Sequence, residues 1–353
     1  IGASSFADIG IYADQGAIED LTNYISEANF DSSIYYSDVQ TSMFEYFPSG
    51  IMAVPFGIYP SMVFYNQDAF DAAGLEYPPL GYDDMTWTYD KVREYGMTLT
   101  LDSDGNNATM DEFDPDDIVQ YGFDDSWING RNLLSMWDSE NPGKVMEDQF
   151  KTAYVNKPEW INGLQWMING IWVDRFIPDS AGQAIYSGMG SGDPFSTEMA
   201  AMFLTHTWYM PEGLTGITFP YDIAPVPVNP SGNRVVRTDF DGFALVKQSD
   251  EKEAAFEFIS WLVQPEQIVD VCLVYGCLPP VEAVEDEYRA IMESKWPGLN
   301  YDVIYEGLNY LNINDGFTVE NQKLNSVLDN MISVIYTNSE ADAEALLNEA
   351  NTD

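Results

Sequence analysis

The chain has 353 residues, of which 45% are hydrophobic and 14% aromatic, so it can bury more than one core and two lobes are expected. With 58 acidic and 14 basic residues, its net charge of −44 argues strongly against nucleic acids and anionic lipid surfaces as partners, because their phosphates would be repelled. The acids alternate with hydrophobic segments, which indicates a solvated acidic surface, typical of secreted proteins or high-salt habitats, and no apolar run is long enough to span a membrane.

The first hundred residues alternate between strand and helix patterns. Residues 8–12 are predicted to form a short strand, followed by a loop and a helix. A second strand is predicted to end at Pro55, before a turn over residues 57–60 and a third strand over residues 62–65. The helix after it is expected to end at Gly74, and a Pro-rich loop and a further helix complete this part of the chain.

The next segment, "DSDGNNATMDEF", is similar to a calcium-binding loop. Its first, third and fifth positions supply oxygen-bearing side chains, namely Asp102, Asp104 and Asn106. Gly105 comes one position early, and Phe113 stands at the twelfth position in place of Glu. An Asx/Gly turn between two segments is the alternative, so a structural Ca²⁺ is a possible cofactor here and no other is expected.

The central and C-terminal parts are predicted to be rich in helices. Pro158 suits the first turn of an amphipathic helix whose core stripe includes Trp160, Trp166 and Trp172. The segment "AAMFLTHTWYM" then indicates a buried strand, and residues 280–353 carry mostly helical spacing. Strands and helices alternate along the whole chain, which predicts an α/β fold with parallel sheets, arranged as two lobes with a cleft between them.

Cys272 and Cys277 are the only cysteines in the chain. Two cysteines cannot form a zinc tetrad or a disulfide framework. One interpretation is a pair of free or buried thiols near a helix end. The other is a local disulfide, which requires the helix to stop between them, and Gly276 could end it there.

No catalytic motif is recognisable. His206 is the only histidine, and its position inside an apolar strand indicates a structural role. Carboxylate pairs occur, for example Asp124 with Asp125 and Asp239 with Asp241, but pairs are expected by chance among 58 acids. A hydrolase that uses two carboxylates therefore stays open as an alternative, although no pair singles itself out.

In their order along residues 6–285, several segments resemble one family. They include "ADIGIY", "AVPFGIYPSMVFYNQDAFDAAGLEYPP", "DPFSTEMAAMFLTHTWYMP" and "YDIAPVPVNPSGNRVVRTDFDGFALVKQ". The ordered set resembles the extracellular solute-binding proteins of carbohydrate ABC importers, the family 1 group that includes maltose-binding protein. The resemblance implies a two-lobed periplasmic-binding-protein-like fold with a hinged interlobe cleft that closes on a sugar.

The resemblance also implies an organisation, a location and partners. Residues 1–100 are expected mainly in the first lobe and residues 115–240 mainly in the second, with residues 241–353 forming crossing segments and C-terminal helices shared between lobes. The strand–helix–strand unit that opens other family members is missing before "ADIGIY". We therefore expect an extracellular or periplasmic monomer, anchored by lipid through an N-terminus absent here, which delivers its sugar to a membrane permease.

The segment "THTWYMP" is the best candidate for a site on which a sugar ring stacks. The C–H faces of a sugar stack on aromatic rings, whereas its hydroxyls bind carboxylates and amides. The resemblance puts Trp208 in the loop after a second-lobe strand, where relatives carry a stacking aromatic side chain. Tyr209 is expected to point to the opposite face and to pack in the core.

Three further aromatic residues are candidate ligand contacts. Trp127 lies in a loop rich in Gly and Asp, where a core role is hard to satisfy. Tyr59 lies in the predicted turn between two strands, next to a glycine and a proline. Phe195, in "DPFST", is either a contact or a hydrophobic staple at a helix start.

The remaining candidates are carboxylates and their neighbours. Asp239, Phe240 and Asp241 precede a strand, and the two carboxylates could accept hydrogen bonds from sugar hydroxyls. Tyr12 and Asp14 end the first predicted strand and are placed similarly. The number of aromatic candidates favours an oligosaccharide over a monosaccharide, and the binding role without catalysis is favoured over a secreted glycoside hydrolase.

Overall fold

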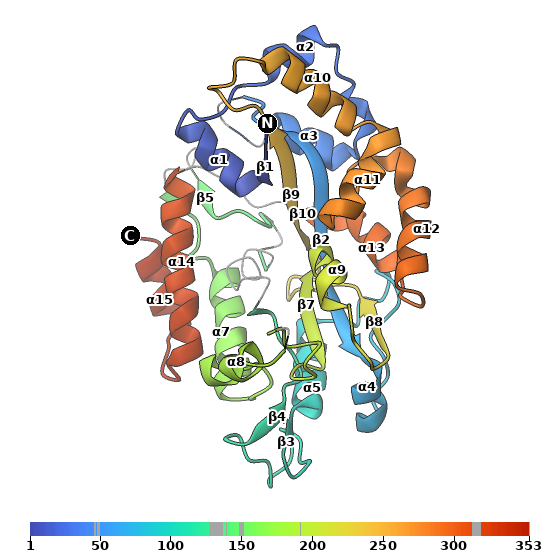
Figure 1. The fold of residues 1–353 in the computed structure, drawn as a ribbon. Helices are drawn as coiled ribbons and strands as arrows, with labels where there is room; N and C mark the ends of the chain where they lie inside the picture. The colour runs from blue at the N-terminus through green and yellow to red at the C-terminus, as the bar shows by residue number, and fades with distance from the viewer. Residues whose placement is uncertain are drawn as a thin grey trace. The chain divides into compact units, whose positions relative to one another are not determined.

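The structure, a computed structural model, describes residues 1–45, 47, 50–126, 137–138, 140–147, 152–190, 192–312 and 319–352 (Figure 1). The chain divides into two units. Unit 1 consists of Ile1–Pro60, Thr238–Pro297 and Asp315–Lys323. Unit 2 consists of Ser61–Arg237, Gly298–Asn314 and Leu324–Asp353. Residues 61–100, expected mainly in the first lobe, thus belong to unit 2.

Strand β2 (Val54–Asn66) explains this difference. The predicted strand–turn–strand over residues 55–65 is a single strand of 13 residues, all of them buried. A β-bulge lies between Pro55 and Gly57, and residues 57–60, which resembled a turn, pair in regular register with residues 238–241 of the neighbouring strand. Because β2 continues without a break from Pro60 to Ser61, the chain passes from unit 1 into unit 2 inside the strand.

Unit 1 contains an antiparallel sheet and two sets of helices. Strand β9 (Val236–Ala244) lies between β1 (Gly2–Ser5) and the first half of β2, and both of its neighbours run antiparallel to it. The helices of this unit are α1 (Phe6–Asp14), α2 (Thr22–Glu27), α3 (Ser37–Glu45), α10 (Lys252–Leu262), α11 (Pro265–Tyr275) and α12 (Glu285–Lys295). Helices α2 and α10 pack together through Tyr24 and Phe256 (Figure 1).

Helix α1 occupies residues 6–14, where the sequence predicts a strand over residues 8–12, and that prediction was wrong. The Ser5 side chain accepts a hydrogen bond from the backbone N–H of Asp8, and its hydroxyl contacts the Asp8 carboxylate at 3.1 Å. This is the pattern of a helix N-terminus. Phe6 and Ile9, three residues apart, form the buried stripe of the helix.

Unit 2 contains a mixed sheet. Its half of β2 pairs antiparallel with β7 (Met202–His206) and with β8 (Tyr221–Ala224). The segment from Tyr121 to Asp124 adds parallel bridges to Ala200 and Phe203, beside β7. Parallel pairing, the arrangement predicted from the alternation of strands and helices, is thus present, but the pairings of β2 with its named neighbours are antiparallel.

The remaining elements of unit 2 are short strands and helices. The strands are β3 (Leu101–Asp102), β4 (Ile118–Gln120), β5 (Met146–Glu147), β6 (Thr152–Ala153) and β10 (Leu311–Asn312). The helices are α4 (Gln67–Ala73), α5 (Tyr89–Leu99), α7 (Pro158–Trp172), α8 (Ser180–Ser187), α9 (Met210–Gly213), α13 (Asp302–Gly307), most of α14 (Val319–Thr337) and α15 (Ala343–Ala350).

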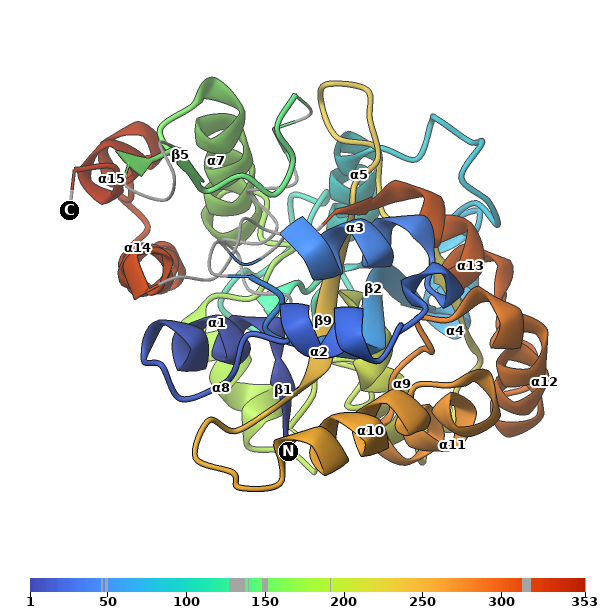
Figure 2. The ribbon, with the colours of Figure 1, turned by 90° about the horizontal axis from the view of Figure 1, so that it is seen from above.

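Helix α7 supplies much of the core of unit 2. It begins at Pro158 as predicted, and Trp160 and Trp166 are buried. Trp172 is partly buried, and its indole Nε1 donates a hydrogen bond to the backbone oxygen of Ile335 in α14 at 2.7 Å. Helices α7 and α15 lie side by side (Figure 2). The three tryptophans therefore serve packing, in agreement with the core stripe read from the sequence.

Across the described residues, every helix is too short or too polar to cross a lipid bilayer.

Candidate functional site

Trp208 is held at the surface of unit 2 by buried neighbours. Strand β7 ends at His206, and Thr207–Tyr209 form a 3₁₀ turn in which Thr207 and Tyr209 are buried whereas 36% of Trp208 is exposed. The Tyr209 hydroxyl donates to Asp193 Oδ1 at 2.8 Å, and its ring packs edge-on against Phe64. The packing role predicted for Tyr209 is thus present, and it fixes the turn that presents the Trp208 indole to solvent.

Asp124 and Asp125 lie at the same edge of the unit 2 sheet as Trp208. The segment that ends at Asp124 runs parallel to β7, with hydrogen bonds from Asp124 N to Met202 O and from Leu204 N to Asp124 O, both 2.9 Å. Because the carboxyl ends of neighbouring parallel strands meet at one edge of a sheet, the residues that follow the two strands share that edge. This is the usual place for a ligand in α/β sheets.

The two carboxylates have different surroundings. Asp124 accepts from the backbone and hydroxyl of Ser126, at 2.8 and 2.6 Å, and from the Tyr186 hydroxyl at 3.0 Å. Asp125 Oδ1 accepts a long hydrogen bond of 3.3 Å from Tyr336, while its Oδ2 is buried without a partner among the described residues. Burial, and next the Asp124 charge, raise the pKa of Asp125 to about 7.

Asp125 is a candidate that the sequence did not single out from other acid pairs. The available signal was the position of "DD" directly after the short strand-like segment "YGF", which ends at the edge just described. Trp127, predicted as a contact two residues later, lies outside the described residues.

In unit 1, Tyr59 and Asp241 form a hydrogen-bonded pair of a buried phenol and a partly buried carboxylate. The Tyr59 hydroxyl donates to Asp241 Oδ2 at 2.9 Å, and Tyr59 lies directly opposite Asp239 in the β2–β9 ladder. Asp239 and Asp241 are two residues apart on β9 and therefore point to the same face of the sheet. Asp239 and Asp241 are both partly exposed, so this face of the sheet offers a ligand two carboxylates beside the phenol of Tyr59.

The electrostatics of the pair are set by burial and by like charges. Burial raises the pKa of Asp241 to about 6, the hydrogen bond from Tyr59 lowers it, and the charges of Asp239 and Asp8 raise it further. Burial also raises the pKa of Tyr59, which keeps the phenol protonated and donating. Asp241 is thus an acceptor whose ionisation changes close to neutral pH.

Phe240 and Phe195 are core residues, which corrects the expectation of accessible rings. Phe240 is 2% exposed and packs against Phe6, with 5.7 Å between ring centroids. Phe195 is fully buried, and its ring packs edge-on against Phe219. Neither ring has a face open to a ligand, because alternate residues of β9 point into the core and Phe195 follows a buried Asp193 turn.

Tyr12 and Asp14 lie on helix α1, not at the end of a strand, so the reason for choosing them no longer holds. Both are exposed. Tyr12 lines an apolar pocket of 300 Å³ in unit 1, formed by Gly2, Ala3, Ser4, Ile9, Tyr12, Ala17, Ile18, Ala244 and Val246. A role for either residue in ligand binding stays a prediction.

Asp102, Asp104 and Asn106 form a tight turn. Asp102 Oδ1 accepts from the backbone N–H of Asp104 and Asn106, and its Oδ2 accepts from the Asn106 side chain and the backbone of Asp114. The hydrogen bond from Asp114 is the main cause that lowers the pKa of Asp102. Within the described residues, no three His, Cys, Asp or Glu side chains gather to hold a metal ion. Asp102 thus forms an Asx turn, and a Ca²⁺ ion bound by this segment stays a prediction.

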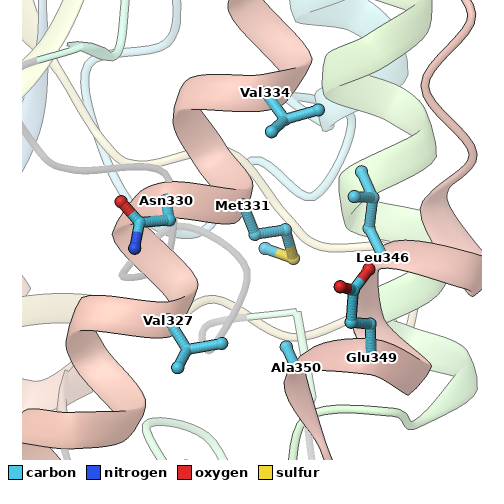
Figure 3. A pocket seen from close by; sticks show the side chains of 7 residues that line it. All are labelled: Val327, Asn330, Met331, Val334, Leu346, Glu349 and Ala350. Atoms are coloured by element: carbon cyan, nitrogen blue, oxygen red, sulfur yellow. The ribbon is translucent and has the colours of Figure 1, made fainter. Parts of the chain in front are cut away.

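A further pocket of 210 Å³ lies between α14 and α15 of unit 2 (Figure 3). It is lined by Val327, Asn330, Met331, Val334, Leu346, Glu349 and Ala350. None of these residues belongs to the edge that carries Trp208 and Asp125, and the lining is mostly aliphatic. The pocket is a packing groove between two helices.

Solved structures with the same fold span nearly the whole chain. An ABC substrate-binding protein from Listeria monocytogenes, in complex with cycloalternan, is 20% identical with a TM-score of 0.79 over 99% of this chain and 82% of its own. UgpB from Mycobacterium tuberculosis, in complex with glycerophosphocholine, is 17% identical with a TM-score of 0.73 over 99% and 81%.

A third structure, the cyclic alpha-maltosyl-1,6-maltose binding protein from Arthrobacter globiformis, is 19% identical with a TM-score of 0.71, over 99% of this chain and 82% of its own. These likenesses show the two-lobed α/β fold. No match was found among curated proteins. The family model for bacterial extracellular solute-binding proteins matches residues 3–269, more than half of the sequence. The chain therefore belongs to the family of bacterial extracellular solute-binding proteins.

Proposed function

We propose that this protein is the substrate-binding component of an ABC importer and that its ligand is a carbohydrate, most naturally an oligosaccharide. The observation that carries the proposal is Trp208, whose indole is held partly exposed at the sheet edge that also carries Asp125. Two relatives with this fold, one solved in complex with cycloalternan and one a cyclic alpha-maltosyl-1,6-maltose binding protein, support the same class of ligand.

The chemistry of these side chains suits a sugar. An indole face attracts the C–H groups of a pyranose ring, and the buried neighbours of Trp208 hold the backbone of its turn, which lowers the entropy cost of binding. Carboxylates such as Asp239 and Asp241 accept hydrogen bonds from hydroxyls, and the Tyr59 phenol fixes the second of them. We infer that a sugar ring stacks on the Trp208 indole and that the carboxylates of Asp239 and Asp241 accept hydrogen bonds from its hydroxyls.

A phosphorylated solute is the competing ligand within the binding class, because one relative was solved with glycerophosphocholine. The net charge of −44 repels an anionic phosphate, whereas glycerophosphocholine is a zwitterion without net charge and escapes that repulsion. A phosphodiester therefore belongs in the ligand panel, where it is expected to bind more weakly than a sugar because it has no pyranose face to stack on Trp208.

We infer that the bound sugar is not cleaved. The family is one of binding proteins, and a glycoside hydrolase needs two carboxyls about 5–10 Å apart on one face of the ligand site. Asp124 is buried and accepts three hydrogen bonds, from the backbone and hydroxyl of Ser126 and from Tyr186, which disfavours a role as nucleophile or acid. Delivery to a membrane permease, a monomeric state and a lipid anchor stay predictions from the family resemblance.

Calorimetric titration of Trp208→Ala tests the proposal. The variant should bind the best oligosaccharide at least roughly tenfold more weakly than the parent, which is about 1.4 kcal/mol, because the stacking surface is lost. Its melting temperature should change little, because the indole is partly exposed and the turn is held by Tyr209.

Trp261→Ala is the matched control, since Trp261 is 52% exposed on α10 in unit 1. This variant should bind like the parent. Equal affinity of Trp208→Ala and the parent, with both proteins folded, would remove Trp208 from the site.

A further inference from the structure

The two cysteines meet at the C-terminus of helix α11. The helix ends at Tyr275, and Gly276 adopts a left-handed conformation with φ of 83°. The backbone N–H groups of Gly276 and Cys277 both donate to the carbonyl oxygen of Cys272, at 2.7 and 3.2 Å. This reversal brings the residue after the glycine back against the last full turn of the helix, where side-chain contact between the two positions is common.

The side chains of Cys272 and Cys277 lie together in the core of unit 1. They are 0% and 2% exposed, and both thiols are directed at the carbonyl oxygen of Phe56, with sulfur–oxygen distances of 3.2 and 3.8 Å. Phe56 lies within the β2 bulge, between the residues whose register shifts against β9. Burial, and next the neighbouring Cys277 thiol, raise the pKa of Cys272 well above its ordinary value.

The thiols also support the face that carries Tyr59. A Cβ atom on Gly57 would lie 2.6 Å from Cys277 Sγ, so the strand passes directly over this sulfur. Leu278 then forms two backbone hydrogen bonds with Ile58, at 3.0 and 3.1 Å. Residues 277–278 thus tie the end of α11 to the strand segment that continues into Tyr59.

We propose that Cys272 and Cys277 form an intrachain disulfide that closes the C-terminal turn of α11, where it packs against β2. Each thiol gives up one hydrogen, a sulfur–sulfur bond forms, and two electrons and two protons pass to an external disulfide, which is reduced to two thiols. The family is extracellular, where such oxidants persist. Because both sulfurs are buried, the bond forms as the chain folds and is then shielded from reductants.

Peptide mapping tests the bond directly. No Lys or Arg separates the two cysteines, so trypsin releases both in one peptide, residues 253–289. The full chain is refolded in glutathione buffer, unfolded in urea with an alkylating agent and no reductant, and digested. The expected peptide carries no alkyl group and lacks two hydrogens, and prior reduction should restore two alkylation sites. Two alkylated cysteines, glutathione adducts or a disulfide-linked dimer would overturn the proposal.

A second measurement tests whether the folded state favours the disulfide more than the closeness of the two cysteines in sequence does alone. The dithiol–disulfide equilibrium with glutathione is measured for the native chain and in urea, approached from the reduced and the oxidised protein. The native fold should favour the disulfide by roughly tenfold or more relative to urea. An equal or smaller equilibrium constant for disulfide formation in the native state would contradict the proposed bond.

The stability of the oxidised chain supplies a readout with a matched control. Reductant should lower the urea midpoint of the wild-type chain, because the unfolded state regains the freedom that the closed loop removes. The variant C272S/C277S should show no response to reductant. Identical midpoints for oxidised and reduced wild-type protein would contradict a stabilising bond.

Discussion

Among single residues, Asp125 has the most unusual environment for an acid. Its pKa of about 7 in the folded protein exceeds the value of about 3.9 expected for an unfolded chain. The folded state therefore binds more protons between these two values, and its stability falls as the pH rises from about 4 to about 7. Above pH 7 the full cost of a buried charge is present.

Asp125→Asn should therefore stabilise the protein most above pH 7. We expect a gain on the order of 1–4 kcal/mol at pH 8 and a smaller one at pH 5, because the neutral amide removes the buried charge. Urea unfolding at both pH values measures it. Asp111→Asn, which changes an exposed acid, is the control and should leave the pH dependence unaltered. A stability difference that is the same at both pH values would contradict the assignment.

The substitution Tyr59→Phe tests the hydrogen-bonded pair of Tyr59 and Asp241 in unit 1. Loss of the phenol removes a hydrogen bond that lowers the pKa of Asp241, so that pKa should rise above about 6. If the ionised carboxylate accepts sugar hydroxyls, the affinity of the parent should decline as the pH falls through about 6. The decline should begin at a higher pH in the variant. Calorimetric titrations from pH 5 to pH 8 measure both profiles, and superimposable profiles would exclude Asp241 as the acceptor.

At the scale of elements, unit 2 contains a close contact between two backbone segments. Gly122 passes so near to α5 that a Cβ atom there would lie 2.0 Å from the carbonyl oxygen of Gly96. Gly122→Ala should therefore cost about 3 kcal/mol or more, since neither backbone can yield without moving α5 or the segment before Asp124. Gly2→Ala, where a Cβ meets nothing within 4 Å, is the control. Equal urea midpoints for the two variants would contradict this packing.

The elements also differ in how far the sequence predicts them. Helix α7 was correctly predicted because Pro158 and the spacing of its tryptophans are local signals. Helix α1 is hard to predict because its short apolar run also fits a strand, and the local signal for a helix is the Ser5 cap. Strand β2 was divided in two because Gly57 and Pro60 are typical of turns, whereas here the glycine makes room for Cys277.

The same contrast holds for the candidate site. The exposed Trp208 beside a buried Tyr209 was expected from strand alternation, but β7 ends at His206 and a 3₁₀ turn produces the same difference in exposure. The unusual surroundings of Asp125 were not predicted, because they depend on Tyr336, which lies 211 residues away in sequence. Phe195 and Phe240 could not be distinguished from accessible rings, because side-chain burial depends on partners such as Phe219 and Phe6.

For the molecule as a whole, the net charge of −44 is the dominant electrostatic property. Like charges repel one another in the compact state, and salt shortens the range of that repulsion from about 30 Å at 0.01 M to about 3 Å at 1 M. The melting temperature should therefore rise between low and high NaCl. KCl at equal ionic strength is the control and should act alike, because screening depends on ionic strength. A constant or falling melting temperature would contradict the account.

The central claim, that the protein binds an oligosaccharide through Trp208 without cleaving it, is tested most directly by one titration. Wild-type protein is titrated with a panel of oligosaccharides and glycerophosphocholine in a calorimeter, and the recovered sugar is analysed for new reducing ends after prolonged incubation. We predict saturable binding of at least one oligosaccharide, weaker binding of the phosphodiester, and unchanged sugar. Steady release of reducing ends, or heat only from the phosphodiester, would contradict the claim.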